Sequence, residues 1–315
     1  MKRPSKTLLA AFGLALTLTA CGSSESNNSE SSTLMVSIEP LRYVAEQIVP
    51  QGIEVTTMMD RGSNPETFDP TMARRMEADQ SVAFVSTGCF PFEQSIRASL
   101  RDGVECIEVG EGMDFIYGTH EHVFADEEHA HIDHEHDAST SEADMEHEHD
   151  GDVLQVLQAD PHIWTSARNM KLLAGNLADA LVKMYPGQKS VIRKNQEKFS
   201  ARMDSIDTVI SGRLSNAGKA FAVWHPSLSY FARDYALEQI AVGAESKEVS
   251  PRKLKEIIDE ARADSVHVFF FQREYDSRQA QTINEAIGSR LVTIDPLSYD
   301  WEQQIFVITD ELAKD

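Results

Sequence analysis

The sequence predicts an α/β protein of two lobes, each a parallel sheet flanked by helices. Short runs rich in Val, Ile and Phe alternate with amphipathic stretches along most of the chain, and this alternation indicates parallel strands covered by helices on both faces. A long helical region, 166–215, divides the runs into two sets. The chain has 315 residues, and a domain size of about 150 residues is consistent with two domains.

The first twenty residues are expected to be a secretory signal. A basic start precedes an uncharged run, 8–20, which is too short to span a bilayer comfortably. The run ends in Leu-Thr-Ala-Cys at Cys21, a motif that resembles the bacterial lipobox, in which cleavage leaves a lipidated N-terminal Cys. An ordinary signal peptide with a Cys by chance is the alternative. The Ser/Asn/Glu-rich residues that follow favour a lipoprotein with a disordered tether at 21–33. The mature protein would then lie in the periplasm or cell envelope, anchored to a membrane by acyl chains.

The first lobe is assigned to 34–186. Its expected strands are 34–38, 53–58, 81–86 and 104–109, and its clearest helical patterns are 41–48 and 92–100. A further helix is expected to begin after Ser166, a favourable N-cap residue.

A linking helix, 187–215, follows the break at Pro186-Gly187. Its pattern covers about 28 residues, or roughly 42 Å at 1.5 Å per residue, which is long enough for a rigid strut between two lobes.

The second lobe is assigned to 216–315. Its expected strands are 221–224, 239–243, 266–271 and 291–294, and its helical patterns are 251–262 and 277–287. The stretch 38–45 weakly resembles 225–232, as if the two lobes began alike.

A His-rich and acidic loop, 120–150, is expected within the first lobe. It contains twelve Asp or Glu, no Lys or Arg, and eight of the eleven histidines. These are His120, His122, His129, His131, His134, His136, His147 and His149. Such a segment cannot form a core. Imidazoles alternating with carboxylates offer many transient ligand sets for zinc, copper, iron or nickel, so the loop predicts accessory metal binding.

Four further residues are candidate metal ligands: Glu66, His162, His225 and Asp295. They lie near the carboxyl ends of expected strands or at the start of a helix, where open α/β sheets place ligands. Each alone has an ordinary structural explanation, since an Asp before Pro is most often a turn former. Their common placement predicts one site.

Charge and motifs narrow the class of function. The chain carries 29 basic and 51 acidic side chains, a net charge of −22, which argues against nucleic acid because phosphate contacts need clustered Lys and Arg. The sequence contains no His-Glu-x-x-His, no nucleophile elbow and no phosphate loop, so we expect a binding protein and not an enzyme. An exported metalloenzyme with an open coordination position is one alternative. A surface metal buffer that uses only the loop is another.

The two remaining cysteines, Cys89 and Cys106, leave two interpretations open. Thiols outside the cytoplasm tend to pair, so a disulfide is possible. Two free thiols are the alternative, and geometry must decide because a disulfide needs Cα atoms within about 7 Å.

Several segments carry, in order, a resemblance to a known family. They are Val-Ser-Ile-Glu-Pro-Leu at 36–41, Asp-Pro-His-Ile-Trp at 160–164, the segments 225–239 and 269–272, and Ile-Asp-Pro-Leu at 294–297. From about Leu34 to the C-terminus the chain resembles the solute-binding lipoproteins of zinc and manganese ABC importers, particularly the ZnuA-like group. Zinc members of that group carry a His-rich loop before the Asp-Pro-His segment. The resemblance implies two α/β lobes joined by a rigid helix, with one metal ion in the inter-lobe cleft.

The resemblance also implies a ligand set, with one departure. By position, His162, His225 and Asp295 match the second, third and fourth ligands of the family. The first is a His in a Pro-His-Thr-Tyr/Phe-Glu/Asp-Pro pattern, and Glu66 occupies that place here. A carboxylate can bind zinc at about 2.0–2.2 Å, so Glu66 can serve directly, or a loop histidine can fill the place.

The expected function follows from this set. A set of two His and two carboxylates also resembles the ligand sets of the manganese-binding members of the family, since carboxylate oxygens suit manganese. The loop favours Zn²⁺, with Mn²⁺ or iron as the alternative. We therefore expect a monomeric extracytoplasmic protein that captures Zn²⁺ and delivers it to an ABC permease with its ATPase subunit.

Overall fold

The computed structural model describes residues 32–117, 159–243, 251–273, 275 and 277–314. Residues from Ser31 onward form one compact unit. The predicted signal peptide, the lipidation site Cys21 and the whole His-rich loop 120–150 lie outside the described residues. The first strand begins at Ser32, so residues 32 and 33 belong to the sheet and not to the predicted tether.

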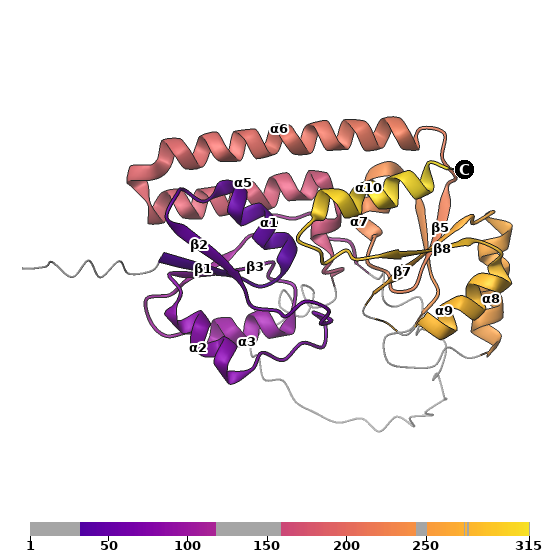
Figure 1. Ribbon diagram of the computed structural model, residues 1–315, viewed down its shortest axis with the longest axis horizontal. Coiled ribbons are helices and arrows are strands. Elements are labelled where there is room, and N and C mark those ends of the chain that lie inside the picture. Colours follow the sequence, from indigo (N-terminus) through magenta and orange to yellow (C-terminus); the bar gives the residue numbers. More distant parts are fainter. Residues whose placement is uncertain (1–31, 118–158, 244–250, 274, 276, 315) are drawn as a thin grey trace, which may run out of the picture. The chain divides into compact units, whose positions relative to one another are not determined.

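The first lobe contains a four-stranded parallel sheet with the strand order β2-β1-β3-β4. Its strands are β1 (Ser32–Val36), β2 (Ile53–Thr57), β3 (Ala83–Ser86) and β4 (Glu105–Glu108). The crossover helices are α1 (Glu39–Ile48), α2 (Met72–Gln80) and α3 (Pro91–Ser99). Figure 1 shows α1 on one face of this sheet and α2 and α3 on the other.

The second lobe repeats this topology with the order β6-β5-β7-β8, again all parallel. Its strands are β5 (Ala220–Val223), β6 (Glu238–Ala241), β7 (Val268–Gln272) and β8 (Arg290–Ile294). Its helices are α7 (Ser229–Tyr235), α8 (Pro251–Ala263), α9 (Ser277–Ile287) and α10 (Trp301–Leu312). Every strand predicted from the sequence is confirmed, with ends that agree within two residues. The similar stretches 38–45 and 225–232 both follow the first strand of a sheet.

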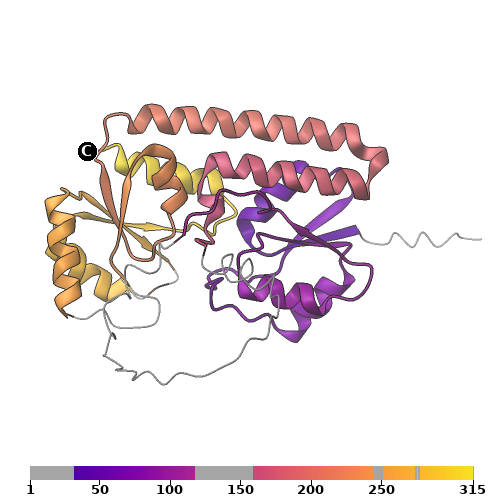
Figure 2. The same ribbon diagram turned by 180° about the vertical axis from the view of Figure 1, so that it is seen from behind.

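Two long helices connect the lobes. A short 3₁₀ turn, η2 (Ile163–Thr165), leads into α5 (Ala167–Met184), and a second turn, η3 (Pro186–Gln188), leads into α6 (Lys189–Leu214). Ser166 caps α5 as predicted, because its Oγ accepts a hydrogen bond from the Asn169 N–H at 3.0 Å. Helix α6 packs along α5 and contacts both α1 of the first lobe and α10 of the second. It is the predicted joining helix, and it runs along both lobes (Figures 1 and 2).

The topology of each sheet indicates that a ligand would bind at the carboxyl ends of its strands. The central strands are almost fully buried, as for Leu34 of β1 and Phe270 of β7, because helices cover both faces of a parallel sheet. The crossover direction reverses between β1 and β3 and again between β5 and β7. In open α/β sheets, ligands bind outside the carboxyl ends of strands at such a reversal. Within the described residues, no helix combines the length and apolar composition needed to cross a bilayer.

Candidate metal centre

Three of the four predicted ligands come together between the lobes. Glu66 lies in the loop after β2, His162 directly precedes η2, and His225 follows β5. One potential ligand atom from each lies within 4.8 Å of the others. Both histidines are 4% exposed, and the Glu66 side chain is 16% exposed. The three groups therefore form a largely buried set of one carboxylate and two imidazoles.

The three potential ligand atoms form a triangle whose size is compatible with zinc. The Nε2 atoms of His162 and His225 lie 3.2 Å apart. Glu66 Oε1 lies 3.3 Å from Nε2 of His225 and 3.7 Å from Nε2 of His162. Tetrahedral zinc with bonds of about 2.0–2.1 Å separates its ligand atoms by about 3.3–3.4 Å. The circle through a triangle with these sides has a radius of about 2.0 Å, so an ion can reach all three atoms at zinc bonding distance with little rearrangement.

A buried carboxylate orients His162. Asp160 Oδ1 lies 2.9 Å from Nδ1 of His162 and accepts a hydrogen bond from the His162 backbone N–H, also at 2.9 Å. Burial alone would raise the pKa of the Asp160 carboxyl, but the charge and hydrogen bonds of His162 hold that pKa below its ordinary value. An ionised carboxylate keeps the proton on Nδ1, which leaves the lone pair of Nε2 for a metal. Asp160 therefore makes the contacts that the outer partner of a carboxylate–histidine–metal arrangement requires.

Gln272 positions the backbone of His225. Gln272 is fully buried at the end of β7, and its Nε2 donates to the His225 carbonyl at 2.6 Å while its Oε1 accepts from the His225 N–H at 3.2 Å. Trp224, the residue before His225, packs against Gly243, where a Cβ would lie 2.5 Å from the indole. Glycine at 243 is therefore needed for the indole to occupy this place beside the site.

Two tryptophans connect the segment that carries His162 to the segment that carries Asp295. Trp164 Nε1 donates to the Pro296 carbonyl at 2.8 Å, and Trp301 Nε1 donates to the Trp164 carbonyl at 2.8 Å. Trp164 is fully buried, and Trp301 is 2% exposed. The segments that carry His162 and Asp295 are thus held together by hydrogen bonds within the core.

The fourth predicted ligand, Asp295, is not part of the three-residue group. It follows β8, and its Oδ2 lies 3.6 Å from Nη1 of Arg273. The β7–β8 register pairs Gln272 with Ile294, which places Arg273 and Asp295 side by side. Its side chain is 27% exposed.

Comparison with known proteins identifies the family of this chain. The family model described as "Zinc-uptake complex component A periplasmic" (ZnuA) matches residues 34–307. The chain belongs to the ZnuA family. It is 22% identical over 267 residues to the zinc-binding protein AdcA of Streptococcus pyogenes, which covers 82% of this chain and 49% of AdcA. It thus spans about half the length of the AdcA proteins it matches. It is also 24% identical over 296 residues to the high-affinity zinc uptake system protein ZnuA of Bacillus subtilis, covering 90% of this chain and 85% of that protein.

Solved structures of ZnuA-type proteins share the fold. The crystal structure of a ZnuA deletion mutant with zinc bound has a TM-score of 0.73 and 24% identity, covering 90% of this chain and 97% of that one. The structure of FpvC from Pseudomonas aeruginosa in complex with Mn²⁺ has a TM-score of 0.68 and 20% identity, covering 90% and 97%. The two-lobed α/β architecture predicted from the sequence is therefore confirmed.

The two cysteines in the part of the chain that the structure describes are not paired with each other. Cys89 and Cys106 are both free thiols, so the disulfide left open by the sequence is not formed. Cys106 lies within β4 opposite Phe84, whereas Cys89 lies beyond the end of β3. Burial raises the pKa of both thiols. Neither cysteine belongs to a group of potential metal ligands among the described residues.

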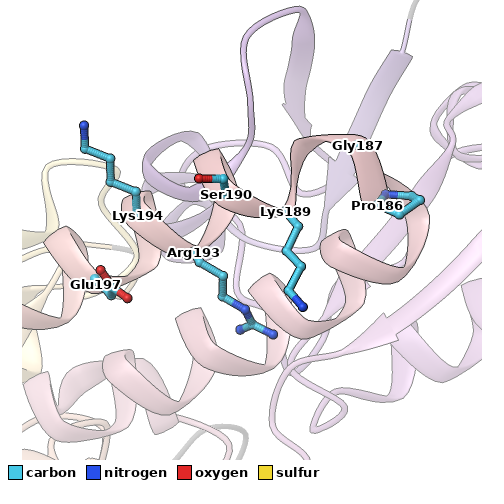
Figure 3. A pocket seen from close by; sticks show the side chains of 7 residues that line it. All are labelled: Pro186, Gly187, Lys189, Ser190, Arg193, Lys194 and Glu197. Atoms are coloured by element: carbon cyan, nitrogen blue, oxygen red, sulfur yellow. The ribbon is translucent and has the colours of Figure 1, made fainter.

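A broad hollow of about 630 Å³ at the start of α6 is separate from the metal centre (Figure 3). It is lined by Pro186, Gly187, Lys189, Ser190, Arg193, Lys194 and Glu197. Its charged groups are mostly basic, and Arg193 pairs with Asp179 at 2.5 Å. Ammonium and guanidinium groups do not bind metal cations, so this hollow has no metal-binding chemistry of its own.

Four residues that support the site were not among the sequence candidates: Asn64, Asp160, Gln272 and Tyr275. Asp160 carried a usable signal, since a carboxylate two residues before a metal-binding histidine is well placed to orient it. Gln272 closes a segment that the family resemblance covers. Asn64 accepts a hydrogen bond from the Glu66 N–H and donates one to the Tyr275 hydroxyl. Asn64 and Tyr275 are 211 positions apart, so no local pattern connects them.

Proposed function

We propose that this chain is the extracytoplasmic solute-binding component of an ABC importer, which captures Zn²⁺ between its lobes and delivers it to a membrane permease with its ATPase subunit. The observation that supports this most directly is the triangle of Glu66, His162 and His225, whose ligand atoms already have zinc-compatible spacing. The relatives named as zinc-binding and zinc-uptake proteins support the same proposal.

The charge of the donor set supports a divalent ion. Two neutral imidazoles and one carboxylate leave a bound Zn²⁺ with one positive charge. In the proposal, Asp295 moves from Arg273 onto the ion and completes a neutral four-coordinate site. The Irving–Williams order places Zn²⁺ above Mn²⁺ for a given site of nitrogen and oxygen ligands. Mn²⁺ or iron is the alternative cargo, favoured by the two carboxylates and by the Mn²⁺ complex of the structurally similar FpvC.

Capture suits this site better than catalysis. A catalytic zinc keeps an open position for water or substrate, whereas the proposed set fills four positions with protein groups. The ligands also come from both lobes, so opening the lobes would separate them and release the ion. The strut formed by α6 contacts both lobes, and we propose that it restricts such opening until the permease acts.

The experiment measures zinc affinity by competition with a chromogenic chelator, in full-length protein and in single variants. Loss of a residue that only hydrogen-bonds a metal ligand lowers metal affinity by about 10–100-fold. His162→Ala and His225→Ala should each lower the zinc affinity of the tight site by more than this, because each removes a ligand itself. His267→Ala is the matched control, because His267 is exposed beside β7 and outside the ligand group; it should leave the affinity unchanged. Retention of one tight zinc ion by the double His162→Ala/His225→Ala variant would place the pocket elsewhere.

A further inference from the structure

A hydrogen bond crosses between the lobes directly beside the proposed ligands. Asn64 lies in the loop after β2 of the first lobe, and Tyr275 lies in the loop after β7 of the second. The side-chain amide Nδ2 of Asn64 donates to the Tyr275 hydroxyl oxygen at 3.2 Å. Loops after β2 and β7 would move apart if the lobes opened, so this bond can exist only while they are close.

On the first-lobe side, Asn64 also holds the ligand Glu66. The Oδ1 atom of Asn64 accepts a hydrogen bond from the Glu66 N–H at 2.9 Å. A side chain that accepts from the backbone two residues later forms an Asx turn. Because Oδ1 is used by Glu66 and Nδ2 by Tyr275, both ends of one amide group are engaged. Asn64 therefore joins the carboxylate-bearing loop to the opposite lobe.

On the second-lobe side, Tyr275 contacts the ligand His225. The two ring centroids are 5.6 Å apart, with an interplanar angle of 31°. The Tyr275 N–H also donates to the Gln272 carbonyl at 3.3 Å, and the Gln272 side chain fixes the backbone of His225. The tyrosine is thus attached to the same local structure that positions the imidazole.

We propose that Asn64 and Tyr275 form a latch that holds the lobes closed over a bound metal ion and sets the rate of its release. The inference rests on the proposed function, because it assumes that the ion lies between Glu66, His162 and His225. Release requires the Glu66 loop to separate from His225, and the latch joins these two regions. Tyr275 is a positioning residue in this proposal and does not bind the ion.

The test is Tyr275→Phe, which removes the hydroxyl and keeps the ring against His225. Loss of one neutral hydrogen bond should speed zinc transfer to excess chelator by about three- to tenfold in stopped flow. The Co²⁺ absorption spectrum should not change, because the ligand set is intact. Tyr235→Phe is the matched control, since that hydroxyl donates to Asp207 at 2.9 Å between α7 and α6; its release rate should stay at the wild-type value.

A double-mutant cycle tests the pairing itself. Asn64→Ala should also speed release, because it removes both the latch hydrogen bond and the turn at Glu66. The double variant Asn64→Ala/Tyr275→Phe should release zinc no faster than Asn64→Ala alone, because the latch is already lost. The effects of the two substitutions are then clearly non-additive. Additive effects, an unchanged release rate in Tyr275→Phe, or an altered Co²⁺ spectrum would each overturn the latch.

A metal-independent measurement separates this proposal from the proposed function. The latch hydrogen bond joins two protein side chains and uses no metal-ligand atom, so Tyr275→Phe should increase hydrogen exchange of the peptide that contains Glu66 in the metal-free protein. Faster exchange in a protein that fails to bind zinc would support the latch and reject the zinc function. Normal zinc affinity with unchanged exchange and release would reject the latch alone.

Discussion

At the scale of single residues, the three grouped candidate ligands are held in different ways. His162 is fixed by a buried carboxylate, Asp160, and His225 by a fully buried amide, Gln272. The backbone N–H of Glu66 donates a hydrogen bond to Oδ1 of Asn64. The Glu66 side chain is also the most exposed of the three. It is therefore the position where a change of ligand type should be tolerated best.

The residue-scale prediction is Glu66→His. We expect zinc affinity to rise and discrimination against Mn²⁺ to improve, because an imidazole nitrogen replaces an oxygen ligand that suits manganese. Competition titrations with both metals measure the change. Asp69→His is the control, since the Asp69 side chain is 90% exposed in the same loop and pairs with Arg75. Unchanged affinity and selectivity in Glu66→His would mean that Glu66 does not touch the ion.

The site could be predicted from the sequence only in part. His225 follows a strand of the second lobe and His162 precedes a helix of the first, so their meeting was implied by the family resemblance and not by a shared sheet edge. The contact of Asp295 with Arg273 was not predicted, because it depends on the register of β7 and β8. The pairing of Asn64 with Tyr275 depends on how the lobes close, and no periodicity in the sequence encodes it.

At the scale of elements, α1, α6 and α10 are connected by one polar cluster. Glu302 of α10 accepts from the Tyr43 hydroxyl of α1 at 2.7 Å, and from Nε of Arg202 of α6 at 3.1 Å. Tyr43 also stacks on Trp301, with ring centroids 6.0 Å apart. The cluster therefore joins the strut to a helix of each lobe.

The element-scale prediction is Glu302→Gln. Its hydrogen bond with Arg202 lowers the pKa of Glu302 from the ordinary 4.5, burial opposes this, and the Tyr43 hydroxyl assists it. A lowered folded-state pKa contributes stability that is present above about pH 4.5 and lost as the pH falls through the folded-state value. The variant should melt lower than wild type at pH 7, by about 2–6 °C. The difference should shrink as the solution is acidified.

Thermal melts of both proteins from pH 7 to pH 3 measure this. Glu311→Gln is the control on the same helix, because Glu311 pairs with Lys314 of the same lobe. A difference between wild type and Glu302→Gln that stays constant over this range would show that the charge of Glu302 does not contribute.

The strands and helices differ in how clearly the sequence predicts them. Strands such as β3 and β7 are buried at every position, so their continuous apolar runs are clear in the sequence. Helix α2 is different, because Ala78 is its only buried residue. It therefore has no apolar stripe, and the pattern did not single it out.

At the scale of the whole molecule, charge is distributed unevenly along the chain. The loop 120–150 carries twelve acidic and no basic side chains, against a net charge of −22 for the chain. More than half of the net negative charge therefore belongs to a segment with eight histidines. We expect such a segment to attract cations electrostatically and its histidines to serve as ligands for them. The candidate site between the lobes, by contrast, has three potential ligand atoms already close together.

The last prediction separates the loop from the site by deletion of residues 120–150. Ordering a loop with this composition around an ion costs chain entropy, so its sites should bind zinc more weakly than the cleft and hold more than one ion. Their attraction for cations should weaken with salt, because the Debye length is about 8 Å at 0.15 M. Titration at low and high salt should show that deletion removes the weak, salt-sensitive sites and leaves one tight site of similar affinity. Loss of the tight site would instead place a loop histidine on the ion and make Glu66 a bystander.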